Sequence, residues 1–178
     1  MKRSIAWTAA VLLMTAPLLL AAVEGSAGGI RWTMPASWKV GQPQPMRAAT
    51  YEIPAAPGAE AASCGIFFFG KGQGGGVDEN LARWSGQISN AAAPAKKSER
   101  MVAGMKVHTI LSTGTYEATM GMKSEGKKTG WTLSGAIVEA PDGLVFFKCV
   151  GPAATMAKAQ PAIDELLKSI VKATAAKV

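Results

Sequence analysis

Two pairs of alternating segments, each joined by a tight turn, constrain the fold of this chain more than any other feature. The first pair is Met101–Val102 and Lys106–Tyr116, which meet at an Ala-Gly turn. The second pair is Trp131–Glu139 and Leu144–Val150, separated by a Pro-Asp-Gly turn of favourable composition. Because parallel strands need a long crossover connection, two such hairpins predict a mainly antiparallel sheet.

Two further strands and two helices complete the predicted layout. Met46–Ile53 alternates and Ser63–Phe69 is strongly apolar, so both are predicted strands. Val77–Asn90 and the segment from Pro152 to about Lys172 place apolar residues at helical spacing, so both are predicted helices. The polar segment Gly121–Gly130 is predicted to be mobile. This order indicates an α+β fold in which helices cover one mainly antiparallel sheet.

The N-terminus has the layout of an export signal. Two basic residues precede an uncharged apolar run, Ile5–Val23, and Gly25-Ser26-Ala27 supplies the small residues of a cleavage site. We therefore predict a signal peptide over residues 1–27, cleaved after residue 27, and a single periplasmic or extracellular domain over residues 28–178. An uncleaved membrane anchor is the alternative, because about 20 apolar residues can span a bilayer. After cleavage we expect no stable membrane insertion.

The composition fits one folded domain. The 178 residues are 48% hydrophobic and 17% charged, which excludes a disordered chain. Two cysteines are too few for a disulfide-dense miniprotein. Cys64 and Cys149 lie far apart in strand-like segments, so outside the cytosol either a disulfide or two buried thiols is open. Their wide separation gives no support for a metal site.

Four short blocks lie along nearly all of the chain beyond residue 27. They are Pro35-x-x-Trp38, Phe69-Gly70-x-Gly72-x-Gly74-Gly75-x-Val77-x-x-Asn80-x-x-Arg83-Trp84-x-x-Gln87, Gly104-Met105-Lys106-Val107 and Phe146-Phe147-Lys148-x-x-Gly151-Pro152. Together with a final amphipathic helix, they resemble a group of exported, uncharacterised bacterial proteins with a PsbP-like α/β/α sandwich. The resemblance implies this fold and export. It implies no activity, no metal site and no photosynthetic role.

The glycine-rich segment before the first predicted helix is a candidate binding loop. Gly70–Gly75 matches the pattern G-x-G-x-x-G, but a dinucleotide site needs a parallel βαβ unit. Asp78 and Glu79 would also oppose a pyrophosphate at the start of that helix. We therefore expect no cofactor, and a tight turn from sheet to helix is the structural alternative. The candidate binding residues of the loop are Gly72, Gly74 and Gly75.

The helix that follows contributes three more candidate binding residues. Asn80, Arg83 and Gln87 are spaced to share one polar face beside the loop. The structural alternative is that Asn80 and Arg83 bond to carbonyl groups of the loop. Trp84 belongs to the apolar face and is a predicted core residue.

The sequence shows no catalytic or metal-binding constellation. His108 is the single histidine, whereas metal sites need several ligands and hydrolase triads need a histidine beside a nucleophile. The net charge of +7 is dispersed and not interleaved with aromatic residues, which argues against nucleic-acid binding. We therefore predict a non-catalytic domain that binds an unidentified protein or envelope component. The alternatives are an enzyme with a site near Gly70–Gln87, and electrostatic adhesion to anionic envelope surfaces.

Overall fold

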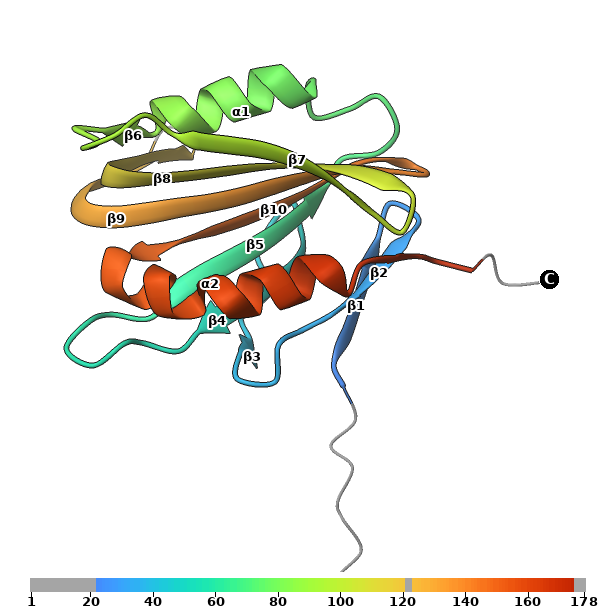
Figure 1. Ribbon diagram of the computed structural model, residues 1–178, viewed down its shortest axis with the longest axis horizontal. Coiled ribbons are helices and arrows are strands. Elements are labelled where there is room, and N and C mark those ends of the chain that lie inside the picture. Colours follow the sequence, from blue (N-terminus) through green and yellow to red (C-terminus); the bar gives the residue numbers. More distant parts are fainter. Residues whose placement is uncertain (1–21, 121–122, 175–178) are drawn as a thin grey trace, which may run out of the picture.

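The main element of the fold is an eight-stranded antiparallel sheet, seen in a computed structural model that describes residues 22–120 and 123–174 (Figure 1). Its strands are β3 (Lys39–Val40), β4 (Arg47–Ile53), β5 (Ala62–Phe68), β6 (Ile88–Ser89), β7 (Lys96–Val102), β8 (Met105–Met120), β9 (Lys123–Ala140) and β10 (Gly143–Pro152). Their order is β3-β4-β5-β10-β9-β8-β6, and β7 also pairs with β8. Both predicted hairpins are present, as β7–β8 and β9–β10. The prediction of a mainly antiparallel sheet with two helices is confirmed.

A second, three-stranded sheet joins the two ends of the described chain. It contains β1 (Glu24–Ala27), β2 (Ile30–Thr33) and β11 (Val171–Lys172), in the order β1-β2-β11. The cleavage predicted after residue 27 would fall at the end of β1, while most of the predicted signal peptide lies outside the described residues. Sequence analysis missed this sheet because its strands are only two to four residues long.

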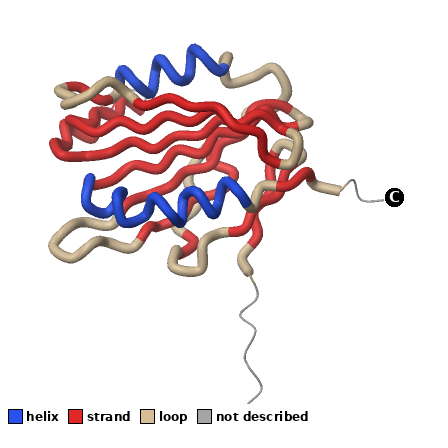
Figure 2. The backbone as a smooth tube through the Cα atoms, in the orientation of Figure 1, coloured by secondary structure: helices blue, strands red, loops and turns tan. Residues whose placement is uncertain are grey.

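The two helices, α1 (Val77–Gly86) and α2 (Ala153–Lys168), lie along opposite sides of the strands (Figures 1 and 2). Alternation along each strand divides the core into two clusters. The sheet side that packs on α2, here called the α2 face, carries Cys64, Ile66, Val107, Val138, Val145 and Phe147. The opposite side, here called the α1 face, carries Phe67, Ile110, Leu133, Ile137 and Phe146. Trp84 of α1 is 3% exposed, so the prediction that it belongs to the core is confirmed.

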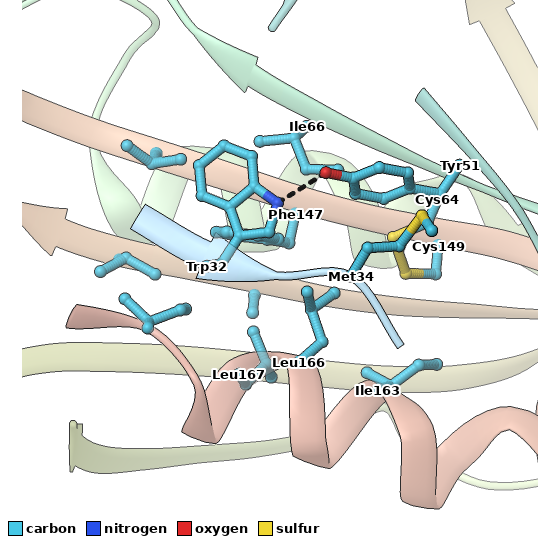
Figure 3. Packing of buried hydrophobic residues seen from close by; sticks show 14 of the residues in the cluster. Trp32, Met34, Tyr51, Cys64, Ile66, Phe147, Cys149, Ile163, Leu166 and Leu167 are labelled. Carbon is cyan, nitrogen blue, oxygen red and sulfur yellow. Dashed lines mark hydrogen bonds between the residues drawn. A yellow bond between two sulfur atoms is a disulfide. The ribbon is translucent and has the colours of Figure 1, made fainter. Parts of the chain in front are cut away.

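The α2 face is covered by side chains from β2 and from α2 (Figure 3). Trp32 of β2 is 1% exposed, and its indole Nε1 donates a hydrogen bond of 2.8 Å to the Tyr51 hydroxyl. Its ring meets that of Phe147 edge-on, with centroids 5.2 Å apart. From α2, Ile163 and Leu166 complete the packing. This apolar layer is the larger of the two core clusters of the described chain.

A disulfide joins Cys64 of β5 to Cys149 of β10. The two residues are direct partners in the antiparallel register, and their sulfur atoms are 2.09 Å apart. Both side chains point to the α2 face and are buried. Closing a loop with a sequence separation of 85 residues removes freedom from the unfolded chain, which stabilises the fold by about 4 kcal/mol.

Three predicted segments differ from the structure. Lys123–Gly130, part of the polar segment Gly121–Gly130 for which the sequence predicts no strand, belongs to β9, because pairing with β8 continues beyond Tyr116. Residues 121–122, which belong to the same predicted segment, lie outside the described residues. Helix α1 ends at Gly86 rather than at Asn90, since the next residues turn to pair with β8.

The C-terminal helix is also shorter than predicted. Helix α2 ends at Lys168, and the Ser169 amide donates a 2.9 Å hydrogen bond to the Glu165 carbonyl. The chain then turns away, buries Ile170 completely and pairs Val171 with β2. Pairing with a strand from the other end of the chain cannot be read from local periodicity. No helix of the described ranges is long and apolar enough to cross a membrane.

Candidate functional site

The glycine loop is held against α1 by side chains of the helix itself. The Asn80 amide nitrogen donates to the carbonyls of Gly74 and Gly76, at 2.9 and 2.8 Å. Asn80 is only 2% exposed, so its amide is committed to the loop. At Gly74, φ is +87° and an added Cβ would lie 2.7 Å from the Phe69 ring, which explains the glycine. For Asn80, the structure therefore shows the structural alternative, in which its side chain bonds to carbonyl groups of the loop.

The six candidate binding residues separate into two groups along α1. Gly72, Gly74 and Gly75 precede the helix and are joined to it by Asn80, whereas Arg83 and Gln87 lie at its C-terminal end. The guanidinium of Arg83 donates to the Asn80 side-chain oxygen rather than to a loop carbonyl. The Gln87 side-chain oxygen accepts a hydrogen bond of 2.7 Å from Nζ of Lys148. Through Gln87, the second group contacts Lys148, a residue to which sequence analysis assigned no role.

Lys148 is a largely buried cation on the α1 face. It lies in β10 between Phe146 and Val150, whose side chains share that face. Its Nζ also donates to the Tyr116 hydroxyl at 3.2 Å and lies 5.4 Å from the centre of that ring. The pKa of Lys148 is lowered from 10.5 to about 8, mainly by burial and in addition by repulsion from the charges of Arg83 and Arg47.

Arg47 of β4 completes a group of three cations with Arg83 and Lys148, here called the cation cluster. Its guanidinium carbon lies 5.5 Å from the centre of the Phe67 ring. An added Cβ at Gly65 would lie 3.2 Å from Arg47 Nε, so the absent side chain leaves room for the arginine. In the described part of the chain, that buried Nε has no hydrogen-bond partner.

Within the described residues, the cation cluster has no carboxylate partner. Among the ion pairs of residues 22–120 and 123–174, none involves Arg47, Arg83 or Lys148. Glu52 lines the same region but makes no such pair. Three neighbouring positive charges without a counter-ion raise the free energy of the protein, and an anion placed among them would lower it.

The cluster borders a hollow of about 490 Å³ over β4, β5, β9 and β10, here called the cationic groove. The residues that give it its character are Arg47, Thr50, Phe67, Tyr116, Lys128, Trp131 and Lys148. The rings of Tyr116 and Trp131 are stacked, with centroids 6.0 Å apart. Nζ of Lys128 lies 4.2 Å from the Trp131 ring centre. The groove therefore combines aromatic walls with positive charge.

His108 lies elsewhere on the sheet and contributes nothing to the groove. Its Nδ1 is 3.0 Å from a carboxylate oxygen of Glu99, and its Nε2 is 2.7 Å from one of Glu139. The two carboxylates approach opposite nitrogens of the ring, so they tie β7 and β9 to β8. In the described segments, no group of three or more His, Cys, Asp or Glu side chains is placed to hold a metal ion.

Comparisons with known proteins inform the fold alone. No protein-family model matches the chain, and no curated protein matches it. The structure is similar to the crystal structure of PA94, a protein of unknown function from Pseudomonas aeruginosa, with a TM-score of 0.50 and 14% identity over 86% of this chain and 98% of that chain. It is also similar to the solution structure of cyanobacterial PsbP (CyanoP) from Synechocystis sp. PCC 6803, with a TM-score of 0.47 and 12% identity over 90% and 98%.

The first likeness shows a shared fold. The second likeness is to a PsbP protein, but its TM-score of 0.47 is too low to support a conclusion about this chain. Membership of the group of exported bacterial proteins with a PsbP-like sandwich therefore stays a prediction. The same holds for the enzymatic alternative near the glycine loop.

Proposed function

We propose that this protein is an exported, non-catalytic binding domain that takes an anionic ligand in the cationic groove. The observation that carries the proposal is the cation cluster, in which Arg47, Arg83 and Lys148 adjoin without carboxylate partners in the described chain. Charge-assisted hydrogen bonds from guanidinium and ammonium groups to an anion are about twice as strong as neutral ones.

The groove also has the size and the free polar atoms that a ligand site needs. Its volume of about 490 Å³ is within the range of small-molecule sites. Arg47 Nε and Thr50 Oγ1 are buried there without partners among the described residues. Buried polar atoms are normally hydrogen-bonded, so the lack of partners for these two atoms supports the proposal that a ligand supplies them.

Two features support the export part of the proposal. The basic and apolar N-terminal sequence has the layout of a signal peptide. The bond between Cys64 and Cys149 is of a kind that persists in oxidising compartments and is rare in the cytosol.

Calorimetric titration with sulfate, a simple probe anion, tests the proposed function. Lys148→Gln removes the central charge, and we expect sulfate affinity to fall at least about tenfold, the value of one charged hydrogen bond. Lys168→Gln, in the last turn of α2, is the matched control, since it removes an equal charge from an exposed site outside the groove. Equal affinity in the wild type and Lys148→Gln, or no binding at all, would contradict the proposal.

A further inference from the structure

The cationic groove continues into a second hollow of different character. This hollow has a volume of about 110 Å³ and shares Phe67 and Lys148 with the groove. Its remaining walls are mainly apolar, with Met46, Phe69, Trp84 and Phe146, but they also include Arg83 and Gln87. Lys148 therefore lies where the cationic groove meets a more apolar hollow.

Two large apolar side chains at this junction are exposed to solvent. Met46 is 70% exposed and Phe69 is 40% exposed. Met46 also has a φ of +63°, a left-handed conformation that a residue with a side chain adopts only at a cost. Phe69 stacks on Phe67, with ring centroids 6.2 Å apart, so the exposed surface is continuous with the wall of the groove. Exposed apolar surface beside a binding hollow is typical of ligand contact.

We propose that the ligand is a single-chain anionic amphiphile, with its charged head at the cation cluster and its apolar chain over Phe67, Phe69 and Met46. This inference rests on the proposed function and adds the chemical class of the ligand. Charge complementarity favours this orientation, because Lys148 lines both hollows, with Arg47 in the groove and Arg83 in the second hollow, whereas the exposed Met46 and Phe69 line the second hollow alone. A small inorganic anion would leave Met46 and Phe69 uncovered.

A chain-length series tests this class of ligand. Binding of acetate, hexanoate, octanoate and decanoate is measured below the concentration at which micelles form. We expect affinity to rise about fourfold for each methylene group until the hollow is filled, because each buried methylene contributes about 0.8 kcal/mol. Decanol, which lacks the charge, should bind at least about tenfold more weakly than decanoate, since it forms no charged hydrogen bond.

A pair of methionine variants locates the chain. Met46→Ser should flatten the dependence on chain length and leave acetate affinity unchanged. Met101→Ser is the matched control, because Met101 is also exposed (64%) but lies on β7. Both positions are at the surface, so both variants should keep the thermal stability of the wild type.

The outcomes separate this inference from the proposed function. Equal affinities for acetate and decanoate would overturn the inference and leave anion binding in place. Failure of sulfate and of every carboxylate to bind would overturn both. Binding to vesicles that contain phosphatidylglycerol, without binding of monomeric decanoate, would overturn the inference in favour of contact with a membrane surface.

Discussion

The two faces of the same sheet differ in how completely they are covered and in the charge that they carry. The α2 face is closed by α2, by Trp32 of β2 and by a disulfide, and its core residues are apolar. The α1 face is covered by α1 over only part of its area, and the remainder carries Arg47, Lys148 and the aromatic walls of the groove. One face therefore supplies stability, which allows the other to keep charged groups in a partly buried position.

This division predicts that mutations on the two faces have separable effects. Substitutions on the α2 face should lower the free energy of unfolding and leave anion affinity unchanged while the protein is folded. Substitutions in the groove should lower anion affinity and have little effect on the free energy of unfolding.

The largest effect is expected at Trp32. Trp32→Ala removes a fully buried ring and leaves the Tyr51 hydroxyl without its donor, so the free energy of unfolding should fall by about 3–5 kcal/mol. Lys148→Gln, in the groove, should cost less stability but weaken sulfate binding, because it removes a charged hydrogen-bond donor. Chemical denaturation and calorimetry measure the two quantities. Comparable stability losses in both variants would break the distinction between the faces.

The next effect concerns β1, which completes the cover of Trp32. The Met34 amide donates to the Val23 carbonyl at 2.8 Å, and Gly25 lies so close to the indole that an added Cβ would be 2.4 Å away. A chain that begins at Gly28 loses these contacts, so it should be less stable than one that begins at Ala22 by about 2–3 kcal/mol, the value of several hydrogen bonds. Thermal unfolding of the two chains measures this difference.

The same contacts bear on processing. Cleavage after residue 27 would remove β1 and the Val23 contact, so we expect a cut before Val23 in place of the one predicted from sequence. Mass spectrometry of the exported protein decides between them, and an N-terminus at Gly28 would contradict the structural argument.

A smaller effect is expected where α1 packs on the sheet. Gly135 lies under Trp84, and an added Cβ would be 2.3 Å from the indole ring. Gly135→Ala should therefore lower the free energy of unfolding by about 1–3 kcal/mol through overpacking. Gly86→Ala, at the end of α1, has open space around the new methyl group and serves as the control. The idea fails if the two variants unfold at the same denaturant concentration.

The smallest effect is a dependence of binding on pH. The pKa of Lys148 is lowered from 10.5 in the unfolded chain to about 8 in the folded protein. Sulfate affinity should decline as the pH rises through about 8, because the ammonium loses its proton. The free energy of unfolding should instead rise with pH between about 8 and 10.5. In this range the Lys148 side chain keeps its proton in the unfolded chain but has lost it in the folded protein.

Lys148→Arg provides the control for the pH dependence. A guanidinium stays protonated throughout this range, so the variant should bind sulfate equally at pH 7 and pH 9.5. A parallel decline in the wild type and in this variant would assign the pH dependence to another group.

Local pattern predicted the sheet and the hairpins because both depend on alternation and turn residues that are adjacent in sequence. It also predicted Arg83 and Gln87 as binding candidates, and the structure brings both to the cation cluster. The groove itself was missed because Arg47 and Lys148 are 101 positions apart and meet only through the pairing of β4 with β5 and of β5 with β10. The available signal was a lysine within the apolar alternation of Phe146 and Val150, where a charge is costly unless it has a use.

The charge state of Lys148 tests the central claim most directly. Nuclear magnetic resonance of the lysine side chains, recorded across pH with and without saturating sulfate, measures the pKa of its ammonium group. The account predicts a midpoint near 8 without sulfate and a higher value with it, because a bound anion stabilises the protonated form. A midpoint at the ordinary value of 10.5, or one that sulfate does not move, would contradict the assignment of the groove as an anion site.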